Sequence, residues 1–165
     1  MLRGLIVTTL CLLLLAAALP AQAEVSVRLD RSGHYVTTQV LAGGFGAVER
    51  KVWSPRGRSL KRSEALNPTG DANGDLFPTI AEQPSAPYYP LVVWSRFDGA
   101  EYDLAWSRWT DRGWEPIQWV SDPDLSGDDL DPDAVFDTGG RPYVIWWRDE
   151  SEGGRIYVST LLDRG

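Results

Sequence analysis

The sequence is poor in the residues that usually form covalent staples or metal sites, with one cysteine, one histidine and one methionine in 165 residues. Cys11 lies in an apolar N-terminal run, so the rest of the chain has no thiol for a disulfide. His34 has no histidine or cysteine partner at ligand spacing, which argues against a zinc site. Packing must therefore hold the fold together, and all eight tryptophans lie after residue 23.

Long apolar runs are also absent after the N-terminus. The run at 5–19 follows Arg3 and precedes the small-residue sequence AQA at 21–23. This pattern predicts a secretory signal peptide over residues 1–23, cleaved after Ala23. A membrane anchor is the alternative, but the run is shorter than the roughly 20 residues that span a bilayer. We therefore expect export, to the periplasm or outside the cell.

Positive charge is in short supply. Without Arg3 the chain from residue 24 onward has 15 basic and 23 acidic side chains, a net charge of −8. Such a surface repels phosphate backbones and anionic lipid head groups, and no basic stripe offsets it. The composition therefore predicts neither a nucleic-acid partner nor a membrane partner.

Internal repetition is the strongest pattern that is present. PLVVWSRFDGAEYDLAWSRWTDRG from residue 90 and PYVIWWRDESEGGRIYVSTLLDRG from residue 142 align without a gap at an offset of 52. Upstream, DLFP at 75–78 corresponds to DLDP at 129–132, and LDRSGHYV at 29–36 begins a weaker third copy. The matching pairs include Val92/Val144, Trp94/Trp146, Arg96/Arg148, Leu104/Ile156, Ser107/Ser159 and Gly113/Gly165. We expect three repeats, over about 24–66, 75–122 and 129–165, in one domain at 24–165.

Each copy has the composition of short β-strands. Runs rich in Val, Trp, Tyr and Ile alternate with turn sequences such as FDG and TDRG, and no helical apolar spacing follows residue 23. In the middle copy we expect strands near 78–82, 90–95, 102–107 and 114–120. The fold class predicted is all-β and propeller-like, with four-stranded antiparallel blades. A β-sandwich is the alternative, although a sandwich does not require equal copies.

The order of these features resembles the bacterial neuraminidase repeat, or Asp-box, propellers of the sialidase superfamily. The resemblance rests on a Trp-containing strand, a strand ending in Ser107, a turn with Asp111 and Gly113, and then Trp114. The usual box reads Ser-x-Asp-x-Gly-x-x-Trp, whereas here the serine and aspartate are four residues apart. The arginine trio, the Tyr-Glu pair and the acidic proton donor of sialidases have no matching positions, so no catalytic residue is carried over.

The third copy stops at the turn before its fourth strand. Three interpretations are open: a half-propeller that dimerises, a truncated product of a longer gene, or an open stack of sheets. In the first two, the edge strand around 156–161 has unpaired backbone groups that offer a template for pairing. We therefore expect a homodimer formed through the C-terminal edge, residues 156–165.

Candidate binding residues follow from the meander, which places two sets of connections on one face. We expect Arg96, Arg148, Asp129 and Asp131 to emerge there, with the two arginines holding an anionic sugar and Trp147 as a flanking aromatic. The alternative is structural, since each arginine has an aspartate with which to form an internal salt bridge. Trp94 and Trp146 are expected to pack between neighbouring blades.

A metal site is the remaining candidate. In DANGD, at 71–75, Asp71, Asn73 and Asp75 alternate as calcium ligands do, but Leu76 replaces the glycine of such loops. An ordinary turn is the preferred interpretation, and no cofactor is expected.

Two functional classes therefore remain open. The first is an exported binding module for a glycan or a protein. The second is a sialidase-like glycoside hydrolase that is active only when assembled.

Overall fold

The computed structural model describes residues 25–29, 35–40, 48–54, 59–66, 74–120 and 126–161. The described residues form β-strands and turns, and none of them forms a helix that could cross a membrane. The expected signal peptide at 1–23 lies outside them, as do Asp71, Asn73 and the last four residues.

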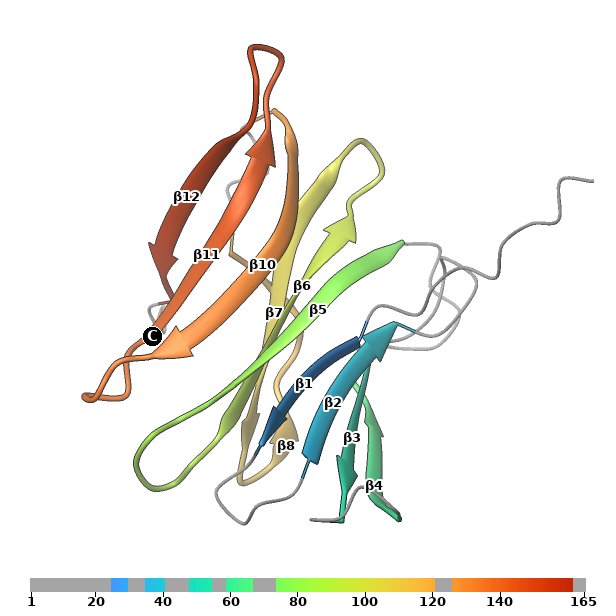
Figure 1. Cartoon of the computed structure of the whole chain (residues 1–165), viewed down its shortest axis with the longest axis vertical. Helices are drawn as coiled ribbons and strands as arrows, with labels where there is room; N and C mark the ends of the chain where they lie inside the picture. Colours follow the sequence, from blue (N-terminus) through green and yellow to red (C-terminus); the bar gives the residue numbers. More distant parts are fainter. Residues whose placement is uncertain are drawn as a thin grey trace, which may run out of the picture.

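The strands form three antiparallel sheets that follow one another along the chain and across the molecule (Figure 1). Sheet one contains β1 (Val25–Leu29), β2 (Tyr35–Val40), β3 (Val48–Trp53) and β4 (Leu60–Ala65). Sheet two contains β5 (Asp75–Glu82), β6 (Pro90–Phe97), β7 (Tyr102–Thr110), β8 (Gly113–Trp114) and β9 (Gln118–Trp119), the last two being short strands that pair with β7. Sheet three contains β10 (Asp128–Phe136), β11 (Pro142–Asp149) and β12 (Arg155–Thr160). Within each sheet consecutive strands pair, as in a meander, except that β9 pairs with β7.

The strand expected at 114–120 differs from the prediction. It is divided into two strands of two residues, β8 and β9, with Glu115, Pro116 and Ile117 between them. Proline has no backbone N–H to donate to a neighbouring strand, so it interrupts the ladder here.

The repeated sequences DLFP and DLDP form the same irregularity in sheets two and three. The pairing register shifts between Leu76 and Thr79, and again between Leu130 and Asp133. The third residue of each motif, Phe77 or Asp131, has a φ of 50°. Each motif is therefore a β-bulge, a place where a strand tolerates proline and changes the direction of its side chains.

Hairpin turns carry aspartates that bind their own backbone. Asp98 Oδ1 accepts hydrogen bonds from the N–H groups of Ala100, at 2.7 Å, and Glu101, at 3.1 Å. These bonds favour the charged carboxylate and lower the pKa of Asp98 below its ordinary value. Gly99 follows with a φ of 118°, which a residue with a Cβ rarely adopts. The β6–β7 connection is thus fixed by local chemistry.

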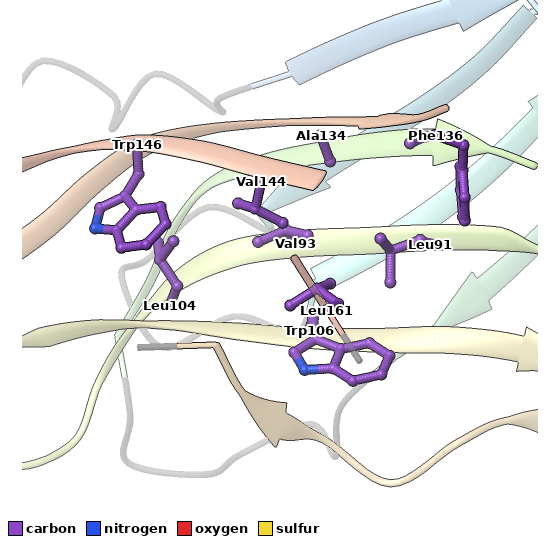
Figure 2. Packing of buried hydrophobic residues seen from close by; sticks show 10 residues of the cluster. Leu91, Val93, Leu104, Trp106, Ala134, Phe136, Val144, Trp146 and Leu161 are labelled. Carbon is purple, nitrogen blue, oxygen red and sulfur yellow. The ribbon is translucent and has the colours of Figure 1, made fainter. Parts of the chain in front are cut away.

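The main core lies between sheets two and three. Alternate residues of β6 and β7 point toward β10 and β11, as the period of a strand requires (Figure 2). Its members are Ala81, Leu91, Val93, Leu104, Trp106, Ala134, Phe136, Val144, Trp146 and Leu161. The opposite face of sheet two forms a second cluster with sheet one, built from Val48, Leu66, Ile80, Val92, Trp94 and Ala105. Sheet two is therefore covered on both faces.

Leucine-to-alanine substitutions test this arrangement with a matched pair. Leu104 is fully buried in the main core, whereas Leu60 on β4 is 46% exposed. We expect Leu104→Ala to lower the free energy of unfolding by about 2–5 kcal/mol, because it removes buried methyl groups and leaves a cavity. Leu60→Ala should change it by less than about 1 kcal/mol. Urea denaturation followed by tryptophan fluorescence measures both, and equal losses would contradict the core assignment.

Candidate functional site

The first element of the candidate site is a buried carboxylate in sheet two. Asp75 begins β5, is fully buried, and is paired in register with Arg96 of β6. Its Oδ1 accepts a hydrogen bond from Trp94 Nε1 at 2.9 Å and another from Arg96 Nη1 at 3.2 Å. A buried carboxylate is stable only when paired in this way.

Sheet three contains the same group with tighter geometry. Arg148 Nε donates to Asp129 Oδ1 at 2.6 Å, and Arg148 Nη2 donates to Asp129 Oδ2 at 2.7 Å. Trp146 Nε1 also donates to Asp129 Oδ1, at 2.8 Å. This bidentate contact raises the pKa of Arg148 above its ordinary value. We refer to Asp75, Trp94 and Arg96, and to Asp129, Trp146 and Arg148, as the two Asp-Trp-Arg groups.

The expectation that Arg96 and Arg148 emerge on a loop face is wrong. Both belong to strands and are only 6% and 3% exposed. Their guanidinium groups bond the chain's own carboxylates, which is the structural alternative that the sequence left open. A ligand role for these arginines stays a prediction.

The other expected site residues are placed apart. Asp131 is exposed on the β10 bulge, two residues from the buried Asp129. Trp147 is half-buried, and its indole lies against the backbone of Gly154, which leaves no room for a Cβ at that position. Of the expected calcium ligands, only Asp75 lies in the described part of the chain, and it belongs to an Asp-Trp-Arg group. No cluster of three or more potential metal-binding side chains occurs among the described residues.

A surface hollow of about 380 Å³ lies at the end of sheet three. Its lining residues are close in the sequence to Asp129 and Arg148, two members of the second Asp-Trp-Arg group. Two connections form it: the segment that leads into β10 and the turn between β11 and β12. Its lining residues include two carboxylates, two hydroxyls and a glycine backbone. The lining residues are Ser126, Gly127, Glu150, Ser151 and Glu152.

Glu150 is held in place by the neighbouring strand. Its carboxylate accepts a hydrogen bond from the Tyr157 hydroxyl and lies 3.4 Å from Arg155 Nε. The hydrogen bond favours the protonated phenol and raises the pKa of Tyr157. The Tyr157 ring stacks on Trp146, with centroids 5.7 Å apart, and lies 5.0 Å from the Arg148 guanidinium carbon. Tyr157 therefore connects the buried group to the hollow.

The opposite wall of the hollow depends on Gly127. Its N–H donates to Glu101 Oε2 at 2.7 Å, which ties this wall to the β6–β7 hairpin. Its φ is 120°, and a Cβ would meet the carbonyl oxygen of Asp149 at 2.5 Å. Glycine is therefore required where the chain passes this close to β11.

The hollow was not predicted from the sequence, although the repeat contains a sign of it. At the offset of 52, Glu150, Arg155 and Tyr157 correspond to Asp98, Asp103 and Ala105. The residues that contact one another at the hollow are thus positions at which the two copies differ.

No protein-family model and no curated protein matches the sequence. Solved structures do match in fold. An endo-arabinase from Bacteroides thetaiotaomicron VPI-5482 superposes with a TM-score of 0.55 at 12% identity, over 85% of this chain and 56% of the enzyme. The GH43 protein BlXynB from Bacillus licheniformis gives 0.52 at 13% identity, over 86% of this chain and 30% of that protein.

These neighbours are β-propeller glycoside hydrolases. The chain has a β-propeller-like fold. It spans about half of the first neighbour and less than a third of the second, and at this identity the likeness concerns the fold alone. These neighbours do not confirm the resemblance to the neuraminidase repeat, which stays a prediction.

Substitutions of Asp129 and of its neighbour Asp131 test how much the second Asp-Trp-Arg group contributes to stability. We expect Asp129→Asn to lower the free energy of unfolding by about 3 kcal/mol or more, because it leaves the Arg148 charge buried without its partner. Asp131→Asn, on the exposed bulge, should change it by less than about 0.5 kcal/mol. Chemical denaturation measures both variants, and a small loss for Asp129→Asn would show that the ion pair is dispensable.

Alkaline titration tests the contact at the hollow. Because hydrogen bonding to Glu150 raises the pKa of Tyr157, its stabilising effect is present below the usual tyrosine pKa and is lost as the pH rises through the raised value. We expect Glu150→Gln to lower the pKa of this phenol toward its ordinary value. The difference in phenolate absorbance between Tyr157→Phe and its parent, measured with and without Glu150→Gln, isolates this one tyrosine. Identical curves would exclude the contact.

Proposed function

We propose that this chain is a carbohydrate-binding part of a β-propeller-like protein, with the hollow at the end of sheet three as its ligand site. The observation that carries the proposal is the lining of the hollow, in which carboxylates and hydroxyls converge at the loop end of a rigid sheet. Loops on a rigid scaffold are the usual position of binding residues. The fold shared with glycoside hydrolases supports a glycan as the ligand class.

The chemistry of the lining favours a neutral sugar. Glu150 and Glu152 accept hydrogen bonds from hydroxyl groups, and Ser126 and Ser151 both donate and accept. A carboxylated sugar would meet these two glutamates with a like charge. The arginines that the sequence offered for an anionic ligand already bind Asp75 and Asp129. The neutral ligand therefore replaces the anionic one in our proposal.

The same proposal includes the finer architecture and the location. The three sheets are successive blades made from a unit of about 52 residues, and the third has three strands in the described part of the chain. Residues 1–23 act as a signal peptide that is removed after Ala23, so the protein works outside the cytoplasm. The ligand is bound without a metal or another cofactor.

Substitutions within the hollow test ligand binding. We expect Glu152→Gln and Ser151→Ala each to weaken binding of a neutral oligosaccharide about tenfold, the loss of roughly 1.4 kcal/mol expected for one hydrogen bond to a ligand. A glycan array identifies the ligand, and calorimetry of the purified chain gives the affinity. Asp111→Asn removes the same charge in the turn after β7, away from the hollow, and should leave the affinity unchanged. Equal affinity in all variants would place the ligand elsewhere.

A glycoside hydrolase is the second candidate, because the structural neighbours are such enzymes and the hollow contains two glutamates. Hydrolysis requires two carboxyl groups, about 5–5.5 Å or 6.5–9.5 Å apart according to the stereochemical outcome. Turnover of neutral aryl glycosides that Glu152→Gln or Glu150→Gln abolishes would favour this candidate. Binding without turnover favours the first.

A further inference from the structure

The β6–β7 and β11–β12 turns are equivalent in the repeat, because each connects strand positions that are related by the offset of 52. In the β6–β7 turn, Asp98 Oδ1 accepts hydrogen bonds from the backbone N–H groups of Ala100 and Glu101. An aspartate at the start of a turn commonly caps the backbone in this way. Both donors of this turn are therefore bonded by the protein itself.

The β11–β12 turn, at the tip of sheet three in Figure 1, has no such cap among the described residues. Glu150 occupies the position of the capping aspartate, but its longer side chain bonds Tyr157 on the neighbouring strand. Its carbonyl oxygen accepts the Gly153 N–H at 2.9 Å, which closes the turn. The Glu152 N–H has no hydrogen-bond partner in the described part of the chain. Because Glu152 lines the hollow, the turn offers a backbone donor at this site.

Packing holds the uncapped turn in place. Trp147 replaces Ser95 of sheet two, and Gly154 replaces Tyr102, so the large side chain of the turn comes from the other strand. The Trp147 indole lies against the Gly154 backbone, whereas the Tyr102 ring packs on Phe97 with centroids 5.4 Å apart. A binding group that is ordered before the ligand arrives loses less conformational entropy on binding. The indole therefore supplies the order that the aspartate cap supplies in sheet two.

We propose, as a step that rests on the proposed glycan-binding function, that Glu150 sets the specificity of the hollow by leaving the Glu152 N–H free to donate to a sugar hydroxyl. The ligand group that fits must accept from this N–H and donate to a carboxylate of the lining, and a hydroxyl does both. A ligand carboxylate or phosphate would accept from the N–H, but the charges of Glu150 and Glu152 would repel it. The ligand class is therefore a neutral sugar with a hydroxyl directed at the turn.

Glu150→Asp tests the proposal, because it keeps the charge and shortens the side chain to that of a capping aspartate. We expect it to weaken binding of the neutral oligosaccharide that binds best on a glycan array by at least about tenfold, since the new carboxylate bonds the Glu152 N–H. Tyr157→Phe releases Glu150 without supplying a cap and should weaken binding by less than about threefold. Equal losses in Glu150→Asp and Tyr157→Phe overturn the proposal.

Glu115→Asp is the matched control, because it makes the same change between β8 and β9, outside the hollow. It should leave the affinity unchanged. Absence of oligosaccharide binding by the parent chain contradicts the proposed function. Binding by the parent chain that Glu150→Asp retains in full leaves the proposed function standing and overturns the role of Glu150 alone.

Amide exchange measured by NMR provides a second test that needs no ligand. The Ala100 amide, which donates to Asp98 Oδ1 at 2.7 Å, serves as the internal reference. We expect its protection factor to be at least about tenfold higher than that of the Glu152 amide in the parent chain. Glu150→Asp should raise the protection of the Glu152 amide and leave that of Ala100 unchanged. Equal protection of the two amides in the parent chain overturns the proposal.

Discussion

The need to neutralise a buried carboxylate organises sheets two and three. Asp75 and Asp129 each lie at the start of a first strand, and each has its charge buried where water cannot solvate it. An arginine of the second strand provides the compensating charge, and a tryptophan two residues earlier provides a further donor. Removing one partner would leave a bare charge in the interior, which is far costlier than losing an exposed ion pair. The register between the two strands follows from this requirement.

The bulge after each aspartate belongs to the same arrangement. An extra residue shifts the register immediately after the carboxylate, so the first strand can bury its aspartate and still direct later side chains into the core. In sheet three, Asp129 is buried, whereas Asp131 has a positive φ and is exposed. In the motif Asp-Leu-x-Pro, the aspartate therefore supplies the buried charge and the third residue adopts a positive φ. The proline falls where the bulge already interrupts the hydrogen bonds between the strands.

The repeat made much of the scaffold predictable from sequence. The strand-rich copies, their meander order and the packing role of Trp94 and Trp146 follow from period and composition. The location of Arg96 and Arg148 did not, because a one-residue shift in a strand boundary decides whether a side chain is buried or reaches a loop. The bulge that follows each buried aspartate depends on a φ of 50° at residues other than glycine, which composition does not reveal.

Comparing the repeated positions of sheets two and three distinguishes residues that both sheets share from residues that are particular to sheet three. Positions that the copies share, such as Trp146 and Arg148, serve packing and charge neutralisation in both sheet two and sheet three. In sheet two, the turn aspartate Asp98 binds its own backbone. In sheet three, the corresponding Glu150 is longer and contacts Arg155 and Tyr157 instead. Arg155 and Tyr157, which Glu150 contacts, also differ between the copies, and this difference supports the ligand site that we propose.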